Sequence, residues 1–521
     1  MFSNKDNVNI LTALLVKHGV HHAVVCPGSR NSAIVHNLNE CPDIQCFPVT
    51  DERSAGFYAL GMTQSLDQPV AVCVTSGTAL LNLAPAVAEA YYQQRPLVVI
   101  SADRPAAWID QLDGQTLPQP DALGRFVCKA VSLPEPHDDD SRWYCNRLVN
   151  EALIEKHGPV HINVPISEPL FDYTIPVLPD ERKIERAEAD ATNVTLTSVC
   201  SMFLHAKRPM LIAGQPMNPH LDEAVCLVGD DESYVPDFVL YCGGSIVSKR
   251  LKHFLRKAKE TWAVNRTGEV NDTFMNLTRV IQGDAEVVAD LIRFNLEQLP
   301  HPFVQKWETL LEQVAKHAEA YEPDYSQMAV VKYFEQQASL LHPSSVAFHY
   351  ANSSAIRLAN IYSQHPVFCN RGVNGIEGSL STAAGFSVAS GKQTFCVIGD
   401  LSFFYDQNAL WNQNLKGNLR ILLLNNGKGG IFNLLKGLEQ SPACDRFVAA
   451  EHHTSAEGIC RQNDVVYLSA RNKEDMQQGI TRLLTDDAPR PMVLEVFTDA
   501  SEDERVFRDY LSSIARACSL S

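Results

Sequence analysis

The chain alternates short, continuous apolar runs with longer segments of helical periodicity. In the first third of the chain, the apolar runs lie at residues 23–26, 70–74, 97–100 and 160–164. Runs of this kind, without polar alternation, are typical of strands that are buried on both faces. A helix is expected from Leu11 to His18, with Gly19 as its C-terminal stop. Buried strands that alternate with helices predict a parallel sheet covered by helices on both faces.

The same alternation of apolar runs and helical segments occurs in two further parts of the chain. Apolar runs at 210–214 and 238–242 indicate a second, smaller unit. Runs at 394–398 and 420–424 belong to a third unit, which starts near Ser345. The first and third units are alike in size and in their order of strands and helices.

The segments between these units have a different composition. Residues 176–197 are charged and contain proline, so they are predicted to be a linker. Residues 303–340 are predicted to be mostly helical and to lead into the third unit. We therefore predict an α/β protein of three doubly wound domains with mainly parallel sheets. Their expected ranges are 1–178, 198–325 and 330–521.

Polar residues follow the two apolar runs of the third unit. Gly399-Asp400 ends the first run and Asn425-Asn426 ends the second, with residues 401–424 between Asp400 and Asn425. Because the carboxyl ends of neighbouring parallel strands meet at one edge of a sheet, this carboxylate and amide are expected at the edge where open α/β sheets bind ligands. Oxygen donors there suit Mg²⁺, which completes its shell with water and substrate phosphates. Either dipeptide alone is usually a turn, but together they predict a magnesium and diphosphate site.

Composition narrows the classes of function. The 521 residues are 45% hydrophobic and have a formal net charge of −17, with a pI near 5.4. Such an acidic chain is not expected to bind nucleic acid or an anionic membrane. The 14 Cys are scattered without zinc spacing, which favours buried, reduced thiols. With no apolar signal core at the N-terminus and no run of membrane-spanning length, a cytoplasmic enzyme is expected.

Motifs of other nucleotide-binding folds fit poorly. No Gly-x-Gly-x-x-Gly follows a predicted strand into a helix. Residues 385–394 have some likeness to a P-loop, but the spacing from Gly385 to Gly391-Lys392 is one residue too long. Gln393 also stands where a P-loop requires Ser or Thr. A kinase-like or NAD-dependent function is therefore disfavoured.

A second candidate region lies in the first unit. Asp51-Glu52 opens a predicted helix of small residues, in which Gly56 and Gly61 permit close packing. Acidic residues in a first turn are favoured by the helix dipole, so the pattern alone has a simple structural explanation. The loop Thr75–Ala79 follows a predicted strand of the same unit.

Taken together, these motifs resemble the thiamine diphosphate-dependent enzymes. Gly399-Asp400 followed by Asn425-Asn426 is similar to that family's cofactor fingerprint, with Leu401 in place of the usual Gly, as in one branch of the family. Glu52 and the loop Thr75–Ala79 also match. Within the superfamily, the chain most resembles the synthases of menaquinone biosynthesis. The segments that carry this closer likeness are Cys26–Arg30, Asp51–Arg53, Ser101–Pro105, Asn370–Gly378 and Gly399–Asp406.

The resemblance implies a reaction and an assembly. The expected enzyme is a transferase, specifically a carboligase, that requires thiamine diphosphate and Mg²⁺ or Mn²⁺. It would decarboxylate 2-oxoglutarate and add the resulting succinyl carbanion equivalent to isochorismate in a 1,4 sense. Residues 1–178 would be the pyrimidine-binding domain, 198–325 the central domain and 330–521 the pyrophosphate and metal-binding domain. The active site would lie between the subunits of a homodimer or homotetramer.

The resemblance also implies roles for single residues. Glu52 would hydrogen-bond the pyrimidine N1′ of the cofactor, for which a buried Glu with a raised pKa is suited. Gln115 would face the reacting intermediate, and Ile376 would hold the cofactor in a bent form. The further cofactor-binding positions would be Thr78, Gly399, Asp400, Leu401, Ser402 and Asn426. The metal would be held by Asp400, Asn426 and the backbone carbonyl of Lys428.

The expected substrates each carry two carboxylates, so an acidic chain needs local cations to bind them, preferably Arg. Any one of the candidate basic residues would more often be a solvated surface charge. Together they lie at strand ends or helix starts and match basic positions of the family. The expected substrate-binding residues are Ser29, Arg30, Gln115, Lys249, Arg250, Ser353, Arg357 and Arg371.

Three alternatives stay open at this point. Another thiamine enzyme, such as an acetolactate synthase or a 2-oxo acid decarboxylase, handles smaller substrates and does not need this set of cations. An NAD-dependent or nucleotide-binding enzyme is disfavoured by the missing glycine-rich motifs. A catalytically inactive homologue is disfavoured because Glu52 and Asp400 are both present.

Overall fold

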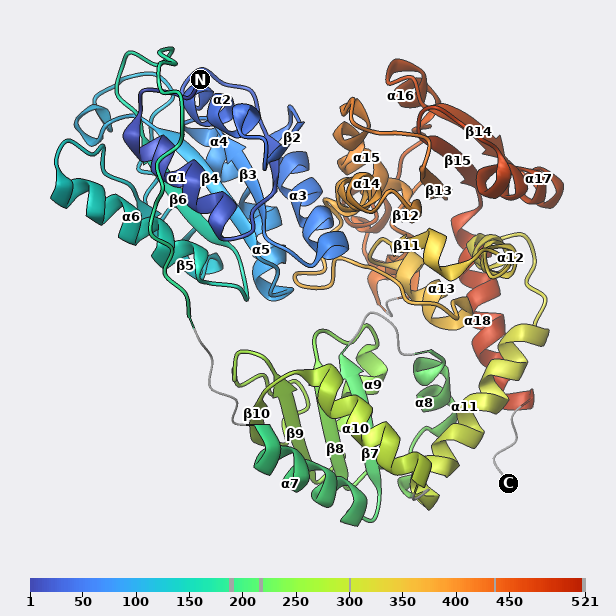
Figure 1. Cartoon of the computed structure of the whole chain (residues 1–521). Coiled ribbons are helices and arrows are strands. Elements are labelled where there is room, and N and C mark those ends of the chain that lie inside the picture. The colour runs from blue at the N-terminus through green and yellow to red at the C-terminus, as the bar shows by residue number, and fades with distance from the viewer. Residues whose placement is uncertain (187–191, 215–218, 299–300, 435–436, 518–521) are drawn as a thin grey trace.

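The computed structural model describes residues 1–186, 192–214, 219–298, 301–434 and 437–517. The chain forms three units, each built on one parallel sheet. In Figure 1 the first unit (blue to teal) and the third (yellow to red) lie side by side, with the central unit (green) below them. The fold class predicted from the sequence is confirmed. The domain boundaries stay a prediction, although each predicted range contains one of the sheets.

The first unit has a six-stranded sheet of order β2-β1-β3-β4-β6-β5. Side chains at alternate strand positions point to two separate cores, one on each face of the sheet. Helices α1 (Asp6–Lys17), α2 (Ser32–Glu40) and α6 (Asp139–Leu153) cover one face, and α3 (Glu52–Leu66) and α5 (Ala84–Tyr92) cover the other. The short α4 is Thr78–Asn82. The strands are β1 His22–Val25, β2 Gln45–Pro48, β3 Val70–Val74, β4 Leu97–Asp103, β5 Lys129–Ser132 and β6 Val160–Pro165.

The central unit has a four-stranded sheet of order β10-β9-β8-β7. Its strands are β7 Pro209–Gly214, β8 Phe238–Gly243, β9 Glu260–Asn265 and β10 Leu277–Gln282. Helices α7 (Thr192–His205) and α10 (Ala285–Gln298) lie on one face, and α8 (Leu221–Val228) and α9 (Lys249–Leu255) lie on the other. The described part of the predicted linker is extended, residues 187–191 of it lie outside the described residues, and α7 begins within its predicted range.

Two helices connect the central and third units, as predicted for residues 303–340. They are α11 (Pro302–Ala320) and α12 (Gln327–Ala338). The third sheet has the order β11-β12-β13-β15-β14, with strands β11 Val346–Tyr350, β12 Gln393–Gly399, β13 Leu419–Asn425, β14 Val466–Ala470 and β15 Met492–Phe497. The helices of this unit are α13 Ser354–Tyr362, α14 Ser379–Ser390, α15 Asp400–Tyr405, α16 Glu457–Gln462, α17 Lys473–Thr485 and α18 Ala500–Ala517.

Short helical turns lie in the connections. They are Ala106–Trp108, Gly124–Phe126, Glu232–Tyr234, Pro343–Ser345, Gln407–Trp411, Gly430–Leu434, Leu438–Gln440 and Cys444–Val448. The segment 385–394 runs from the end of α14 through the turn at Gly391 into β12. This order of helix, turn and strand is the reverse of a P-loop, so the rejection of that motif is confirmed.

The first and third sheets share a strand order. The sequence β1-β3-β4-β6-β5 in the first unit corresponds to β11-β12-β13-β15-β14 in the third, and β2 is an added edge strand. In the first sheet, β6 lies between β4 and the edge strand β5. In the third sheet, β15 lies in the same way between β13 and the edge strand β14. The similarity of the two units, which was predicted from their rhythm, therefore extends to their topology.

Close helix packing joins the first and third units. A Cβ placed on Gly61 of α3 would collide with the backbone carbonyl of Thr382, and one on Gly385 of α14 would collide with the carbonyl of Tyr58. Only a hydrogen atom fits at either point, which lets the backbones of α3 and α14 approach closely. This contact explains Gly61 in the helix that follows Glu52, whereas Gly56 packs against Ala86 of α5.

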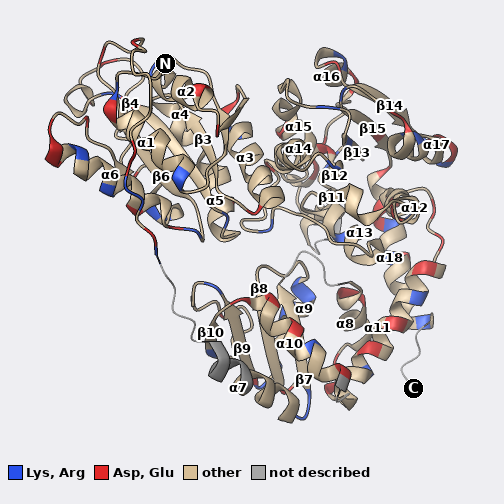
Figure 2. Cartoon of the chain, viewed as in Figure 1, with Lys and Arg blue, Asp and Glu red and all other residues tan. Residues whose placement is uncertain are grey.

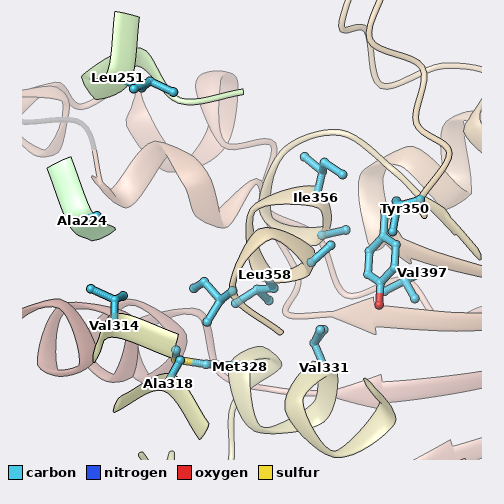
Figure 3. Close-up of a cluster of buried hydrophobic side chains, with 14 of the residues drawn as sticks. Ala224, Leu251, Val314, Ala318, Met328, Val331, Tyr350, Ile356, Leu358 and Val397 are labelled. Atoms are coloured by element: carbon cyan, nitrogen blue, oxygen red, sulfur yellow. The ribbon is translucent and has the colours of Figure 1, made fainter. Parts of the chain in front are cut away.

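The central and third units share one apolar core. It runs from α8 and α9 through α11, α12 and α13 to the third sheet. Figure 3 shows part of it, with Leu251 and Ala224 of the central unit, Val314 and Ala318 of α11, and Ile356 and Tyr350 of the third unit. Charged residues lie mainly on helices and loops, and most of the strands are uncharged (Figure 2).

Two expectations about the whole chain can be compared with the structure. The thirteen described Cys are all free thiols, and Cys518 lies outside the described residues. Among the described residues, none of the helices has the length and apolar composition that a membrane crossing requires.

Candidate active site

Five predicted site residues follow the strands of the first sheet, at its carboxyl edge. Ser29 and Arg30 come after β1, Glu52 after β2, Thr78 after β3 and Gln115 in the loop after β4. Ser29, Thr78 and Gln115 are exposed, Glu52 is half-buried and Arg30 is buried. The topology therefore places these residues on the edge where parallel sheets bind ligands.

Glu52 is the first residue of α3. The Asp51 side chain caps this helix by accepting a hydrogen bond from the Ser54 N–H at 3.0 Å, and its other oxygen accepts one from Asn408 Nδ2 at 2.7 Å. Glu52 Oε2 accepts a hydrogen bond from Asn82 Nδ2 at 3.2 Å. The expected buried Glu is thus half-buried in the single chain. Burial raises the pKa of the Cys26 thiol, and the negative charge of Glu52 raises it further.

The loop that carries Gln115 is held against the loop that carries Thr78. Gln115 has a positive φ of 54°, and its backbone would lie 3.2 Å from a Cβ on Gly77, which itself has a φ of 85°. The Gly77 N–H donates to Gln119 Oε1 at 2.7 Å, and Gln119 Nε2 donates to Asn163 Oδ1 at 2.8 Å. Gln119 is fully buried, so it anchors both loops to the sheet.

Arg30 is only 6% exposed. Its Nη1 donates to the carbonyl of Ile166 at 3.0 Å, and its Nη2 lies 3.5 Å from Glu168 Oε1. Burial lowers the pKa of Arg30, and the neighbouring Arg104 lowers it further. Arg104 in turn pairs with Asp113 at 2.9 Å, in the loop of Gln115. Two guanidiniums therefore lie near each other beside this loop.

Asp400 lies at the carboxyl end of β12, beside the end of β13. It is 4% exposed, and its Oδ2 accepts hydrogen bonds from the N–H groups of Gly427 at 2.8 Å and Asn426 at 3.2 Å. Its Oδ1 accepts one from the N–H of Leu401 at 2.7 Å. The residues Asp400 and Asn426, which are far apart in sequence, are thus brought together because β12 and β13 are parallel neighbours.

The other predicted metal ligands follow β13. Gly427, with a φ of 79°, turns the chain so that the Lys428 N–H points at Asn426 Oδ1, 3.4 Å away. Asn426 Nδ2 donates to Asp503 Oδ2 at 2.9 Å, which fixes the amide. The preceding Asn425 is 3% exposed and donates to the buried Glu495 at 2.7 Å, so it supports the strand end.

This arrangement fits Mg²⁺ and a diphosphate. One carboxylate, one amide oxygen and a carbonyl in a glycine-rich turn are hard oxygen donors, and they leave positions for phosphate oxygens and water. Among the residues that the structure describes, no three His, Cys, Asp or Glu side chains form a metal site of their own. His452 lies beside the site, with Nε2 3.4 Å from Asp400 Oδ2, and Asp400 raises the pKa of His452.

A cluster of cations joins the central and third units. We call Lys249, Arg250, Arg357 and Arg371 the cation cluster. Burial lowers the pKa of Arg371, and Arg357 lowers it further. Burial likewise lowers the pKa of Arg357, and Arg250 adds to that change. The charges of Arg250 on α9, Arg357 on α13 and Arg371 in the loop between α13 and α14 therefore act on one another.

Lys252 lies outside the predicted site residues but belongs beside this cluster. Burial lowers the pKa of Lys252, and Arg371 and Lys249 lower it further. Lys252 lies three residues after Lys249 on α9, so the two side chains share a face of the helix. That spacing is the signal in the sequence that could have revealed it.

The loop from Asn370 to Gly378 carries Arg371 and Ile376. Arg371 Nη1 donates to Asn352 Oδ1 at 3.0 Å, next to Ser353, which has a φ of 74°. Arg371 Nε is buried without a hydrogen-bond partner among the described residues. The Ile376 side chain is 41% exposed. The loop thus presents an unpaired donor and an exposed apolar side chain.

The first unit also holds this loop. The two carboxylate oxygens of Glu89 accept hydrogen bonds from the N–H groups of Gly372 at 2.7 Å and Val373 at 2.6 Å. In the described chain, the hydrogen bonds of Glu52 and of Asp400 stay within their own units. The predicted site residues therefore form three groups: the first sheet's edge, the third sheet's edge and the cation cluster with its loop.

The sequence matches known proteins over nearly its whole length. The model of the thiamine pyrophosphate enzyme N-terminal TPP binding domain matches residues 6–123, and that of the C-terminal TPP binding domain matches residues 351–496. A 2-succinyl-5-enolpyruvyl-6-hydroxy-3-cyclohexene-1-carboxylate synthase of Bacteroides fragilis is 45% identical over 98% of this chain and 99% of its own length. A synthase of the same name from Phocaeicola vulgatus is 42% identical over 98% of this chain and 98% of its own length. Another, from Flavobacterium johnsoniae, is 32% identical over 95% of this chain and 96% of its own length.

Proposed function

Because the chain belongs to the family of 2-succinyl-5-enolpyruvyl-6-hydroxy-3-cyclohexene-1-carboxylate synthases, we infer that it is a thiamine diphosphate-dependent carboligase of menaquinone biosynthesis. It decarboxylates 2-oxoglutarate and adds the remaining four-carbon unit to isochorismate, releasing CO₂. The observation that carries this function is the match to the Bacteroides fragilis synthase, at 45% identity over 98% of the chain.

Thiamine diphosphate, when bound, supplies the electron sink that decarboxylation of a 2-oxo acid requires. The third sheet's edge holds its diphosphate through Mg²⁺ or Mn²⁺. Asp400 and Asn426 bind the metal by their side chains, and Lys428 binds it by its carbonyl. Gly399, Leu401 and Ser402 form the rest of the diphosphate-binding site. The support is the fixed carboxylate of Asp400, which the N–H groups of Gly427 and Asn426 orient.

Glu52 holds and returns a proton at the pyrimidine N1′. The support is that Glu52 stands at the start of α3 and accepts its hydrogen bond from a neutral side chain, that of Asn82. Thr78 lines the same pocket. Gln115, in the adjoining loop, faces the reacting atoms, and the exposed Ile376 supports the cofactor from the opposite side.

The cation cluster binds the carboxylates of the two substrates, together with Ser29, Arg30 and Ser353. Guanidiniums suit carboxylates because they donate two parallel hydrogen bonds. Arg357 and Arg371 are half-buried and Lys249 and Arg250 are exposed, and a carboxylate ligand would relieve the repulsion between the half-buried pair. The lowered pKa values of Arg357 and Arg371 support this role.

The active site lies between two copies of the chain in the cytoplasm, in a homodimer or a homotetramer. Two observations support an assembly of this kind. Glu52 and Asp400 find their hydrogen-bond partners in separate units of one chain. Exposed Thr78 and Gln115, and half-exposed Glu52, lie at a sheet edge that a partner's third unit would cover.

An omission assay tests the function. Isochorismate loss is followed by absorbance with 2-oxoglutarate, thiamine diphosphate and Mg²⁺ present, and each component is left out in turn. We expect loss of isochorismate only when all four are present. CO₂ release from 2-oxoglutarate or pyruvate without loss of isochorismate would refute the carboligase and identify a decarboxylase instead.

A further inference from the structure

Asp222, near the start of α8, contacts one member of the cation cluster directly. Its Oδ2 lies 3.0 Å from Arg250 Nη1, and its backbone carbonyl accepts a second hydrogen bond from the same nitrogen at 3.2 Å. The Asp222 side chain is partly buried, with 33% of its surface exposed. Arg250 is therefore held by both the side chain and the main chain of one residue.

Asp222 also fixes the start of α9. The hydroxyl of Ser248 donates a hydrogen bond to Asp222 Oδ1 and accepts one from the Leu251 N–H at 2.9 Å, which caps the helix. Lys249 and Arg250 are the first two residues of that helix. Asp222 therefore contacts both Arg250 and the capping residue of the helix that carries Lys249 and Arg250.

A small cavity extends from Asp222 to the third unit. Its volume is about 40 Å³, and Asp222 and Ser248 line it together with Arg357 of α13. Burial lowers the pKa of Arg357, the charge of Asp222 opposes that change, and Arg250 adds to it. One negative charge thus acts on two guanidiniums that belong to different units of the chain.

We propose that Asp222 is a positioning residue for dicarboxylate binding, because it orients Arg250 and offsets the repulsion between Arg250 and Arg357. This proposal rests on the proposed function, which assigns both arginines to substrate carboxylates. Like charges in a partly buried place repel, and a carboxylate beside them lowers the cost of keeping both charged before a substrate arrives. A planar guanidinium must also be oriented to bind a carboxylate with two hydrogen bonds.

The Asp222→Asn variant tests this role, since it keeps the shape of the side chain and removes its charge. We expect the KM for 2-oxoglutarate or isochorismate to rise at least fivefold while kcat stays within twofold. Asp230→Asn is the matched control, because Asp230 follows α8 and forms an exposed ion pair with Lys257 at 2.8 Å. The control should change neither constant more than twofold. An Asp222→Asn variant with both KM values within twofold of wild type would overturn the proposal.

A double-mutant cycle separates positioning from a general effect on the fold. In an Arg250→Gln background, Asp222→Asn should change each KM by less than twofold, because its target is already missing. Losses that multiply in the double variant would show that Asp222 does not act through Arg250, and the proposal would fall.

A third measurement does not depend on turnover. Arg250 in the substrate-free chain is labelled with phenylglyoxal and quantified by mass spectrometry. Asp222→Asn should label at Arg250 at least threefold faster than wild type, and Asp230→Asn should label at the wild-type rate. An unchanged rate in Asp222→Asn would overturn the positioning role. A wild-type chain that fails the omission assay would instead overturn the proposed function, whatever the labelling result.

Discussion

Glu52 and Asp400 carry the same functional group in two different settings. Glu52 is half-buried at a helix start, and a neutral amide is its hydrogen-bond partner. Asp400 is buried and fixed by three backbone N–H groups. Donors that favour the charged form suit a metal ligand, and a less constrained carboxyl suits proton exchange. The environment of each carboxylate therefore separates the two proposed roles.

Replacing Glu52 with Gln should lower kcat by about a hundredfold or more, because a positioned proton-transfer group contributes on that order. The amide keeps the hydrogen-bonding size of the side chain, so the thermal unfolding midpoint should not change. Turnover by the omission assay and a thermal melt are measured together. Glu40→Gln, at an exposed carboxylate of α2, is the matched control and should be as active as wild type. Near-normal turnover of Glu52→Gln would refute the role.

Replacing Asp400 with Asn should raise the Mg²⁺ concentration for half-maximal activity by about tenfold or more, since even residues that only support a metal ligand contribute on that scale. A titration of activity with Mg²⁺ at saturating thiamine diphosphate measures the effect. Asp464→Asn, at an exposed residue of the same unit with a φ of 56° that suits Asn, is the control. Equal Mg²⁺ requirements in the two variants would contradict the metal role.

The spacing of Asp400 and Asn426 could be predicted from the sequence because both follow apolar runs of one parallel sheet. The buried polar chain through Gln119 and Asn163 could not, since its members come from a loop and a strand without a motif. The feature of the sequence that indicates this polar chain is the pair His161 and Asn163 in an otherwise apolar strand. They stand two residues apart, so their side chains share a face of the strand. Ser101 connects them, with Oγ 2.8 Å from each side chain.

At the scale of the elements, the interior strands were easier to predict than the edge strands. The apolar runs correspond to β1, β3, β4, β6, β7, β8, β12 and β13. Of the strands outside that set, β2, β5, β10, β11 and β14 lie at sheet edges, and β9 and β15 are interior. The edge strand β7 is the exception that a run did indicate. In β15, an interior strand, the buried Glu495 interrupts the run.

The contact between α3 and α14 predicts a large effect of one methyl group. Gly61→Ala should destabilise the protein by about 1–3 kcal/mol, because the new Cβ meets the Thr382 carbonyl and the two helices must separate. Gly458→Ala in α16 is the control, since nothing lies within 4 Å of its Cβ position, and it should be neutral or slightly stabilising. Chemical denaturation of both variants measures the difference. A Gly61→Ala protein as stable as wild type would show that the contact is loose.

At the scale of the whole molecule, the sequence indicated three units but not how they join. Glycines in a helix indicate close packing without naming the partner, and the partner of Gly61 lies more than three hundred residues away. The hydrogen bonds from Gly372 and Val373 to Glu89 likewise join the first and third units. Contacts of this kind depend on the folded shape of both units, so no local pattern carries them.

The joint between these units should give the whole protein a pH-dependent stability. Asp406 is 1% exposed and accepts a hydrogen bond from Ser381 of α14, whose hydroxyl lies 2.8 Å from that of Ser54 in the first unit. Burial raises the pKa of Asp406 to about 6. Because the folded state favours its protonated form, this group stabilises the fold most below about pH 4. That stabilisation is lost as the pH rises through 6.

The stability of Asp406→Asn relative to wild type should therefore be greater at pH 7.5 than at pH 4.5, by about 2 kcal/mol. Thermal or chemical unfolding at both pH values measures the gain. Asp464→Asn, at an exposed carboxylate, should show no such difference. A gain that is equal at the two pH values would mean that Asp406 keeps its charge in the folded protein at both.

The shared strand order of the first and third sheets bears on how the chain arose. Two units of one topology whose carboxyl edges carry different residues are what duplication of an ancestral half, followed by divergence of its loops, would leave. The strands kept their order because a change there would disrupt the core, while loop residues could change one at a time. On the proposed function, the copy that carries Glu52 would handle protons and the copy that carries Asp400 would hold the metal and the diphosphate.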